Sequence, residues 1–259
     1  MRRKTELDLR SEMVEVCRLM YERGYIAGLD GNASVRLDRR RLLTTPSGAA
    51  KGRLEPEALV VTDLEGKPLK GKAKPSSELK VHLAVYRLRP EVSAVVHAHP
   101  PASVAHSIAG ISLAKCIVPE TILTVGHIST ATYATPGSRE LAGKLEEHIR
   151  CFDAIIMDRH GTVTMGGDLS EAYQRLETVE HTATISLMAR SLGPVRPLPK
   201  EEVERLYTLA ESAGVSWPFL SCEGCDICPD GTEESTDALV AAITQRVLKI
   251  IGEQRTGIA

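Results

Sequence analysis

The sequence predicts an α/β protein whose mixed or antiparallel sheet is flanked by helices. Three observations point to this fold class. Short apolar segments of strand length alternate with longer segments in which apolar residues recur every three or four positions. Several strand segments are joined by turns too short for the crossover that parallel neighbours require. The chain has 259 residues, of which 42% are hydrophobic and 3% are aromatic, so a large and mainly aliphatic core is expected.

The first half of the chain alternates between helical and strand-like patterns. A helix is expected over 5–23, because apolar residues keep helical spacing there until Gly24. The later elements are strands over 33–37, 41–44 and 58–63, a hairpin turn at 63–67, a helix over 76–90, a strand over 93–98 and a helix after Pro101. This order favours a sheet of short strands with helices packed on it.

The second half repeats the alternation, and three prolines then mark a boundary. The expected elements are a helix over 138–150, strands over 154–158 and 162–165, and a long helix over 169–191. Pro194, Pro197 and Pro199 follow, and beyond them come a helix at about 200–213, a cysteine-rich loop and a last amphipathic helix at about 235–252. The sequence therefore predicts two domains, a body over 1–193 and a helical C-terminal extension over 194–259.

Charge and hydropathy exclude several classes of function. The formal net charge is −2, which gives no general electrostatic reason to bind nucleic acid or an anionic membrane. No uninterrupted apolar run reaches the roughly 20 residues that cross a bilayer, and the basic start lacks the apolar stretch of a secretory signal. We therefore expect a cytoplasmic protein whose partners include neither nucleic acid nor a membrane.

Two histidines lie at the end of one predicted strand. His97 and His99 are two positions apart in the apolar segment around 93–98, so alternation places both rings on the same face of the sheet. Such a pair can share one metal ion, although a His-x-His pair can also simply end a strand. His160 follows another apolar strand, over 154–158. Three imidazoles leave open positions for water or substrate on Zn²⁺, Mn²⁺, Co²⁺ or Fe²⁺.

Two short polar segments have the chemistry of an anion site. Residues 45–48 (TPSG) form a tight turn whose hydroxyls and glycine let backbone N–H groups approach a ligand. Residues 75–78 (PSSE) are expected to open a helix, where N–H groups and two hydroxyls meet the positive end of the helix dipole. Asn32 adds an amide donor beside Gly31. Each segment taken alone also fits an ordinary hairpin turn or helix cap.

These motifs, in this order, resemble those of one family. The order is GNxSxR at 31–36, TPSG at 45–48, PSSE at 75–78, HAHP at 97–100 and HG at 160–161, and YATPGS at 133–138 fits as well. Over residues 7–192 the chain is similar to the class II aldolase/adducin family, typified by L-fuculose-1-phosphate aldolase. The resemblance implies α/β/α layers with a mostly antiparallel central sheet flanked by helices, and a class II aldolase-like catalytic domain over 1–193.

The resemblance also implies a set of site residues. The implied metal ligands are His97, His99 and His160, and the implied catalytic acid and base is Glu78. The implied substrate phosphate-binding residues are Asn32, Ser47, Gly48, Ser76 and Ser77. The bound ion would be Zn²⁺ or a similar divalent cation (Mn²⁺, Co²⁺ or Fe²⁺), and the family's usual assembly is a homotetramer with active sites between subunits.

The reaction implied is that of a divalent-metal-dependent lyase acting on a small phosphorylated sugar. A metal-dependent aldolase of this type reversibly cleaves a ketose 1-phosphate to dihydroxyacetone phosphate and an aldehyde through a metal-stabilised enediolate. Glu78 stands where related epimerases usually carry aspartate, which favours an aldolase or a decarboxylase. The family's aldolases often use a tyrosine near the aldehyde; it has no secure match here, and Tyr133 and Tyr207 are the candidates.

Three other functions fit the same resemblance. A decarboxylase of a 3-keto acid phosphate would form the same kind of enolate by losing carbon dioxide. Methylthioribulose-1-phosphate dehydratases and aldolases carry a similar TPSGxxKG stretch, which Lys51 and Gly52 complete here. Adducin-like members use the fold as an interaction module without catalysis, but those members lack the full ligand set, which is present in this chain.

The extension contains a cluster that the resemblance does not explain. Cys222, Cys225 and Cys228 have the spacing of the first three ligands of an iron–sulfur run, but no fourth cysteine follows. They fit a second metal site whose fourth ligand is a histidine, an aspartate or a neighbouring subunit, and they also fit a redox-sensitive pair. A loop of reduced thiols is the remaining alternative.

Overall fold

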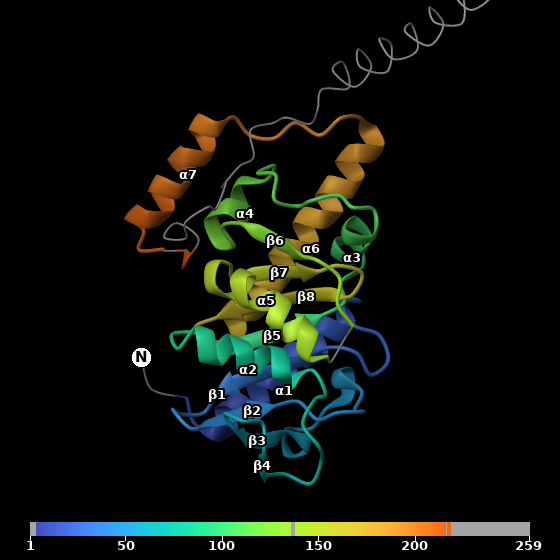
Figure 1. Cartoon of the computed structure of the whole chain (residues 1–259), viewed down its shortest axis with the longest axis vertical. Helices are drawn as coiled ribbons and strands as arrows, with labels where there is room; N and C mark the ends of the chain where they lie inside the picture. Colours follow the sequence, from blue (N-terminus) through green and yellow to red (C-terminus); the bar gives the residue numbers. More distant parts are fainter. Residues whose placement is uncertain (1–3, 136–137, 216, 219–259) are drawn as a thin grey trace, which may run out of the picture. The chain divides into compact units, whose positions relative to one another are not determined.

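The computed structural model of the chain describes residues 4–135, 138–215 and 217–218. All of these residues fall within one compact unit (Figure 1). Among them, no helix is both long and apolar enough to cross a membrane. The helix expected at 235–252 and the cluster of Cys222, Cys225 and Cys228 lie outside the described residues.

Within the described residues, eight strands form one sheet in the order β4-β3-β2-β1-β5-β8-β7-β6. The strands are β1 (Asn32–Arg36), β2 (Arg41–Thr44), β3 (Val60–Asp63), β4 (Pro68–Lys70), β5 (Ala94–Ala98), β6 (Ile128–Ala131), β7 (Ala154–Met157) and β8 (Gly161–Gly166). Only the β6–β7 pair is parallel in this sheet, and every other neighbouring pair is antiparallel. The prediction of a mostly antiparallel sheet is confirmed. As expected, β1 and β2, β3 and β4, and β7 and β8 are joined by turns too short for a parallel crossover.

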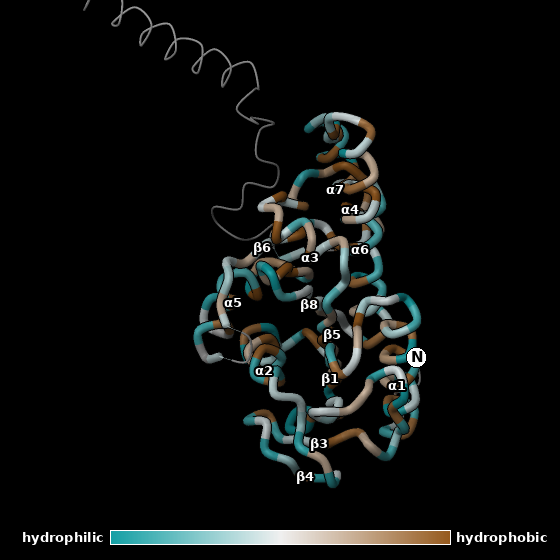
Figure 2. Tube along the Cα trace, turned by 90° about the vertical axis from the view of Figure 1, so that its right-hand side faces the viewer, coloured by the Kyte–Doolittle hydropathy of each residue, from teal (hydrophilic) through white to brown (hydrophobic). Residues whose placement is uncertain are grey.

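Helices cover both faces of the sheet. They are α1 (Glu6–Glu22), α2 (Leu79–Leu88), α3 (Pro101–Ile108), α4 (Pro119–Thr124), α5 (Arg139–Cys151), α6 (Leu169–Leu192) and α7 (Lys200–Ser212), with the short 3-10 turns η1 (Lys51–Arg53) and η2 (Pro56–Ala58). Figure 2 shows α2 and α5 on one side of the central strands and α1 and α6 on the other. The predicted α/β/α layering is therefore confirmed.

The core is divided by the sheet into two aliphatic layers. One layer joins α1 and α6 to the sheet through residues such as Met13, Met20 and Leu176. The other joins α2 and α5 to the opposite face through residues such as Val85 and Leu145. Burial of these aliphatic side chains supplies the main driving force for folding. The core is thus mainly aliphatic, as the low aromatic content predicts.

Most expected elements are present, with two instructive differences. The helix expected from Ser76 begins only at Leu79, because the Ser76 N–H donates to the Thr45 carbonyl, 3.1 Å away, and keeps the chain against the 45–48 loop. The second difference is the parallel strand β6, which was not expected from its polar sequence, ISTA. It pairs with β7 through the crossover helix α5, the usual route between parallel strands.

The expected helix at about 200–213 is present as α7. It packs against α4, and the Leu198 N–H that precedes it donates to the Cys116 carbonyl at 2.8 Å. On α7, the Tyr207 ring meets the Trp217 ring edge-on, with 5.3 Å between centroids. A helical segment thus follows the prolines, whereas the domain division at residue 193 stays a prediction.

Candidate functional site

The strand register brings three candidate residues to one edge of the sheet. In the β1–β5 pair, Asn32 lies opposite His97. In the β5–β8 pair, Ala98 lies opposite Thr162. His160 stands in the turn just before β8, where its N–H donates to the Met157 carbonyl at 3.0 Å. Because these strands are antiparallel neighbours, the start of β1, the end of β5 and the start of β8 meet.

At this edge, His97, His99, His160 and Glu78 form one cluster, which we call the histidine cluster. One ligand atom from each side chain lies within 4.8 Å of all the others. The carboxylate oxygens of Glu78 lie 3.3 Å from His97 Nε2 and 3.0 Å from His160 Nε2. His99 Nε2 lies 3.1 Å from His97 Nε2. The three rings therefore turn their Nε2 atoms toward one another and toward one carboxylate.

The other ring nitrogen, Nδ1, has a different environment in each of the three histidines. His97 Nδ1 donates to the Thr162 carbonyl, 3.0 Å away. Because a carbonyl can only accept a hydrogen bond, the proton of a neutral ring lies on Nδ1. Nε2 then keeps its lone pair. His99 Nδ1 lies 3.5 Å from the Asp30 carboxylate. His160 Nδ1 is buried and has no hydrogen-bond partner among the described residues. Support of this kind at Nδ1 is typical of histidines that bind metals through Nε2.

Gly161 lets the β8 strand approach the rings closely. A Cβ atom built at this position would lie 2.3 Å from the Ala98 carbonyl oxygen, 2.7 Å from Cδ2 of His99 and 2.9 Å from Cε1 of His97. Such separations are shorter than real Cβ contacts. The cluster geometry therefore requires glycine directly after His160.

The charges in the cluster fit a divalent cation. Burial raises the pKa of Glu78, but its hydrogen bonds with His160 and His97 contribute to a larger lowering of that pKa, so the carboxylate is ionised. Burial and the neighbouring His97 and His160 lower the pKa of His99 to about 4, which keeps this ring neutral at neutral pH. Neutral imidazoles and a carboxylate are the ligands of Zn²⁺ and similar ions. The residues present therefore fit the metal that the resemblance implies.

Next to this cluster, three separate segments meet. The Ser47 N–H donates to the Lys74 carbonyl at 2.9 Å, and the Ser76 N–H donates to the Thr45 carbonyl at 3.1 Å. The Asn32 amide donates to the Glu78 carboxylate at 2.9 Å. The segments 29–32, 45–49 and 74–78 therefore lie together, and we call them the loop cluster.

The loop cluster contains the predicted phosphate-binding residues Asn32, Ser47, Gly48, Ser76 and Ser77. Ser47, Gly48 and Ser77 are exposed, and Gly48 has a φ of 68°, a left-handed conformation that favours glycine. Asn32 is buried, and its side-chain oxygen has no hydrogen-bond partner among the described residues. Hydroxyl and amide groups thus adjoin the histidine cluster through the Asn32–Glu78 hydrogen bond.

Two residues that support the site were not among the predicted site residues. Asp30 contacts His99, and Lys51 is buried beneath the loops. Only the TPSGxxKG stretch drew attention to Lys51, and nothing in a single sequence indicates that Asp30 faces a ring on another strand. The Tyr133 side chain is half-exposed after β6, and Tyr207 is buried on α7.

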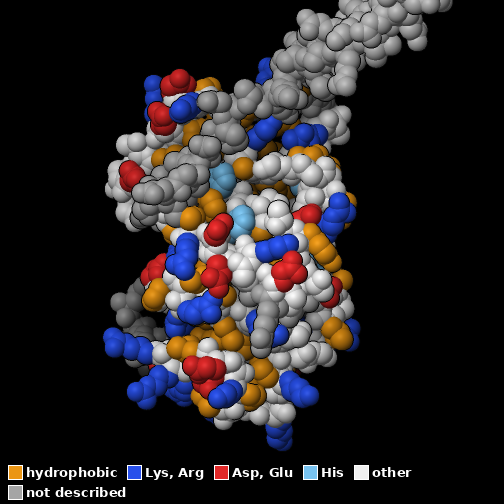
Figure 3. Space-filling view, viewed as in Figure 1, with side chains coloured by type: hydrophobic (Ala, Val, Ile, Leu, Met, Phe, Trp, Pro, Cys, Tyr) orange, Lys and Arg blue, Asp and Glu red, His pale blue; other side chains and the backbone are white. Residues whose placement is uncertain are grey.

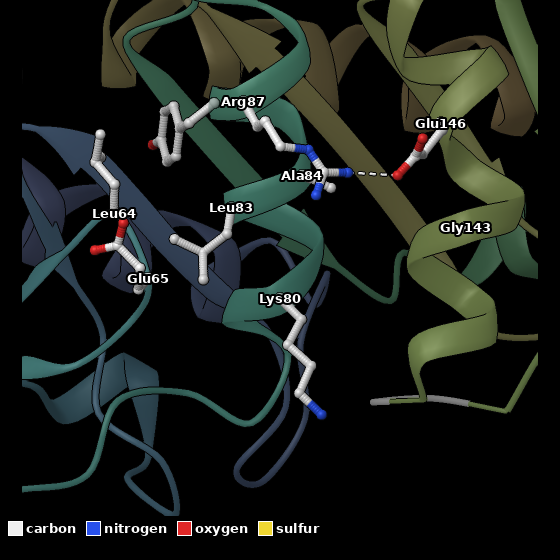
Figure 4. A pocket seen from close by; sticks show the side chains of 9 residues that line it. Leu64, Glu65, Lys80, Leu83, Ala84, Arg87, Gly143 and Glu146 are labelled. Carbon is white, nitrogen blue, oxygen red and sulfur yellow. Dashed lines mark hydrogen bonds and ion pairs between the residues drawn. The ribbon is translucent and has the colours of Figure 1, made fainter.

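The surface and its hollows indicate only part of the site. Lys and Arg side chains are interspersed with Asp and Glu on the face shown in Figure 3. A hollow of about 720 Å³ between α2, α5 and the turn after β3 is lined by Leu83, Lys80 and the Arg87–Glu146 ion pair (Figure 4). None of the predicted site residues lines it. A second hollow, of about 820 Å³, is lined in part by Pro46, Ser47 and Ala49 of the loop cluster. A hollow therefore adjoins the loop cluster, whereas side-chain chemistry identifies the histidine cluster.

Comparison with known proteins agrees with this geometry. The family model of the Class II Aldolase and Adducin N-terminal domain matches residues 11–187. The chain is 38% identical to an L-fuculose phosphate aldolase of Methanococcus maripaludis over 182 residues, which are 70% of this chain and 98% of the relative. It is 40% identical to a 3-oxo-tetronate 4-phosphate decarboxylase of Haemophilus influenzae over 206 residues, which are 78% of this chain and 97% of the relative.

The fold comparison leads to the same family. The crystal structure of YgbL from Klebsiella pneumoniae superposes with a TM-score of 0.74 at 33% identity, covering 79% of this chain and all of that one. The match to the family model spans both the histidine cluster and the loop cluster. The chain therefore belongs to the class II aldolase and adducin family, as a divalent-metal-dependent lyase.

Proposed function

We propose that the protein reversibly cleaves a ketose 1-phosphate, of the kind represented by L-fuculose 1-phosphate, to dihydroxyacetone phosphate and an aldehyde. The observation that carries this proposal is the junction of the two clusters. Three Nε2 atoms and one carboxylate converge within 4.8 Å, and the Asn32–Glu78 hydrogen bond joins them to the hydroxyl-rich loops. A phosphate bound at the loops would hold the neighbouring carbons of the substrate against the histidine cluster.

His97, His99 and His160 are the residues that would hold the metal, and the Glu78 carboxylate lies close enough to approach it. We propose Zn²⁺, with Mn²⁺, Co²⁺ and Fe²⁺ as the alternatives that the same donors accept. When bound, a divalent cation supplies positive charge that stabilises the enediolate formed as the carbon–carbon bond breaks. The support for this choice is the donor set of three imidazoles and one carboxylate.

Glu78 is the proposed acid and base. Cleavage of the C3–C4 bond leaves the bonding electrons on C3, while the C4 hydroxyl gives its proton to the ionised Glu78 carboxylate and becomes the aldehyde. The proton that C3 then takes up comes from Glu78, and in the reverse direction the ionised Glu78 removes a proton from C3. The Asn32 amide, 2.9 Å from Glu78 Oε2, fixes the orientation of this carboxylate.

The loop cluster would bind the phosphate group. The exposed hydroxyls of Ser47 and Ser77 and the exposed backbone of Gly48 are accessible to a ligand, and Ser76 lies between the loops. Hydrogen bonds to a charged phosphate are among the stronger ones in proteins. Binding energy from this non-reacting end of the substrate would position the reacting carbons.

A second candidate is the decarboxylation of a 3-keto acid phosphate. The 40% identity to the Haemophilus influenzae decarboxylase favours it. Loss of carbon dioxide leaves the same kind of enolate as aldol cleavage, but no hydroxyl proton has to be removed from the leaving fragment. This reaction would therefore use the same cluster and Glu78 without a tyrosine.

The proposal extends to the assembly and its location. The family resemblance supports a homotetramer with active sites between subunits, and the near-neutral composition, with no apolar membrane-spanning run, supports a cytoplasmic location. Light scattering of the purified full chain measures the assembly directly: a mass of four chains is expected, and a monomer at micromolar concentration would contradict it.

A substrate test separates the two reactions. The metal-loaded protein is incubated with L-fuculose 1-phosphate and, separately, with a four-carbon 3-keto acid phosphate. Release of dihydroxyacetone phosphate and an aldehyde from the first substrate is the expected result. Release of carbon dioxide from the second alone would establish the decarboxylase, and turnover of neither would count against both.

A further inference from the structure

Lys51 is a buried lysine that the proposed chemistry does not use. Lys51 is 3% exposed. It begins η1 (Lys51–Arg53), which follows the 45–49 segment after Ala50. Its Nζ donates to the Leu29 carbonyl at 2.7 Å and to the Ala49 carbonyl at 2.9 Å. Among the described residues, no carboxylate lies within ion-pair distance of this ammonium. Burial of a charge is costly, so the position requires a reason.

The two carbonyls belong to two different segments of the loop cluster. Leu29 begins the segment that leads to Asn32, and Ala49 directly follows Gly48. A single ammonium therefore joins the segment carrying Asn32 to the segment carrying Ser47 and Gly48. The third segment is held separately, by the backbone bonds of Ser47 and Ser76. The first two segments are also tied where β1 begins, because the Thr45 N–H donates to the Ala33 carbonyl at 3.1 Å; the lysine adds a second link at Leu29 and Ala49.

The charge of Lys51 also interacts with acidic groups of the site. Burial lowers the pKa of Lys51, while Cys17 and the carboxylates of Asp30 and Glu78 act in the opposite direction. Glu78 belongs to the histidine cluster, and Asp30 contacts that cluster at His99. The ammonium therefore lies close enough to the site for its charge to act on an anion bound at the loops.

We propose that Lys51 is a positioning residue for the substrate phosphate. Its ammonium holds the 29–32 and 45–49 segments at the spacing that a phosphate needs. Its positive charge also strengthens binding of the phosphate dianion at the loop cluster. The inference rests on the proposed phosphate site in the loop cluster. It concerns affinity for phosphate and leaves the histidine cluster unaffected.

The test titrates inorganic phosphate into the metal-loaded full chain by calorimetry. Lys51→Met removes the charge and the hydrogen bonds, and Lys51→Gln keeps N–H donors for the carbonyls while losing the charge. Lys67→Met, at an exposed lysine in the turn between β3 and β4, is the matched control. Bound metal and melting temperature are measured for each variant, so that misfolding is recognised.

Lys51→Met is expected to weaken phosphate binding at least tenfold and Lys51→Gln by about three- to tenfold, with normal metal content. In assays with a ketose 1-phosphate that the enzyme cleaves, the KM of each Lys51 variant should rise by a similar factor, while kcat stays within about threefold of wild type. If Lys51 were only structural, its substitution would lower the melting temperature without raising KM at a nearly unchanged kcat. Phosphate binding within twofold of wild type in either folded, metal-loaded variant would overturn the role of Lys51.

Ser77→Ala separates this outcome from a failure of the proposed function. If Ser77→Ala weakens phosphate binding but the Lys51 variants do not, the phosphate site stands and only the role of Lys51 is overturned. If wild-type protein does not bind phosphate, or Ser77→Ala leaves binding unchanged, the phosphate site is wrong and the inference fails with it.

Discussion

The two clusters of the site are built in opposite ways. The histidine cluster is fixed by strand register and by side chains, with His97 only 2% exposed and its ring held by a backbone carbonyl. The loop cluster is fixed by backbone bonds between segments, and Ser47, Gly48 and Ser77 stay exposed. The first arrangement depends on every ligand at once, whereas the second can lose one side chain and keep its shape. Substitutions should therefore have abrupt effects in the first cluster and graded effects in the second.

The largest effect is expected for His97→Ala. Removing this ligand should eliminate bound metal and reduce activity by about 1,000-fold or more, because the charge stabilisation supplied by a metal is worth several kcal/mol and each 1.4 kcal/mol is tenfold in rate. Metal analysis and turnover are the measurements. His181→Ala, at an exposed histidine on α6, is the control and should keep both. Full activity in His97→Ala would show that the histidine cluster is not the reaction centre.

Gly161→Ala should break the histidine cluster without changing a ligand. The added methyl group would lie within 3 Å of the Ala98 carbonyl and of the rings of His97 and His99. We expect metal affinity to fall by about 100-fold, at the upper end of effects from groups that support a ligand, and the free energy of unfolding by about 1–3 kcal/mol. Equilibrium competition with a chelator measures the first, and denaturant titration the second.

Gly143→Ala is the matched control for Gly161→Ala. Gly143 lies in α5, where a Cβ would meet nothing within 4 Å, so alanine should stabilise the helix by about 0.5–1 kcal/mol. Metal affinity should not change. Equal metal loss in the two alanine variants would mean that the close approach at Gly161 does not shape the site.

Ser77→Ala should weaken substrate binding in a graded way. A lost hydrogen bond to a charged group is worth about 1.5–3 kcal/mol, so KM for the phosphorylated substrate should rise roughly tenfold or more while metal content stays normal. Steady-state kinetics measures KM and kcat separately. Ser212→Ala, on α7, should leave both unchanged. A fall in kcat at unchanged KM would place Ser77 outside phosphate recognition.

Asp30→Asn should have the smallest effect in this series. The Asp30 carboxylate lies 3.5 Å from His99 Nδ1 and is half-exposed, so the loss in metal affinity should be near the lower end for such partners, about tenfold. Chelator competition again gives the value. An unchanged affinity would indicate that His99 is oriented by packing alone.

Much of the histidine cluster follows from local sequence pattern. Alternation along β5 places the His97 and His99 rings on one face, and His160 follows a second apolar strand. That β8 is the neighbour of β5, which brings His160 to the same edge, depends on pairing between distant segments. Strand pairing of this kind is set by the whole core, so single-sequence patterns indicate the ligands but not their spacing.

The loop cluster was harder to predict. The motifs around Ser47 and Ser76 could be identified, but the helix was expected three residues too early, because the Ser76 N–H is used by Thr45 across the chain. Asp30 contacts a ring from another strand and Lys51 donates to Leu29, 22 residues away; the TPSGxxKG stretch includes Lys51 but indicates neither contact. Long-range hydrogen bonds between loops are therefore the part that the sequence does not reveal.

Proton exchange in dihydroxyacetone phosphate tests the central claim most directly. Aldol cleavage and its decarboxylase alternative both require that the metal-holding residues, Glu78 and the phosphate site act together on the carbon that bears the hydroxyl group. The account predicts that metal-loaded protein in deuterium oxide exchanges one proton of this carbon stereospecifically, as followed by NMR, and that His97→Ala and phosphate-free dihydroxyacetone show little exchange. No exchange by the metal-loaded wild-type protein would contradict it.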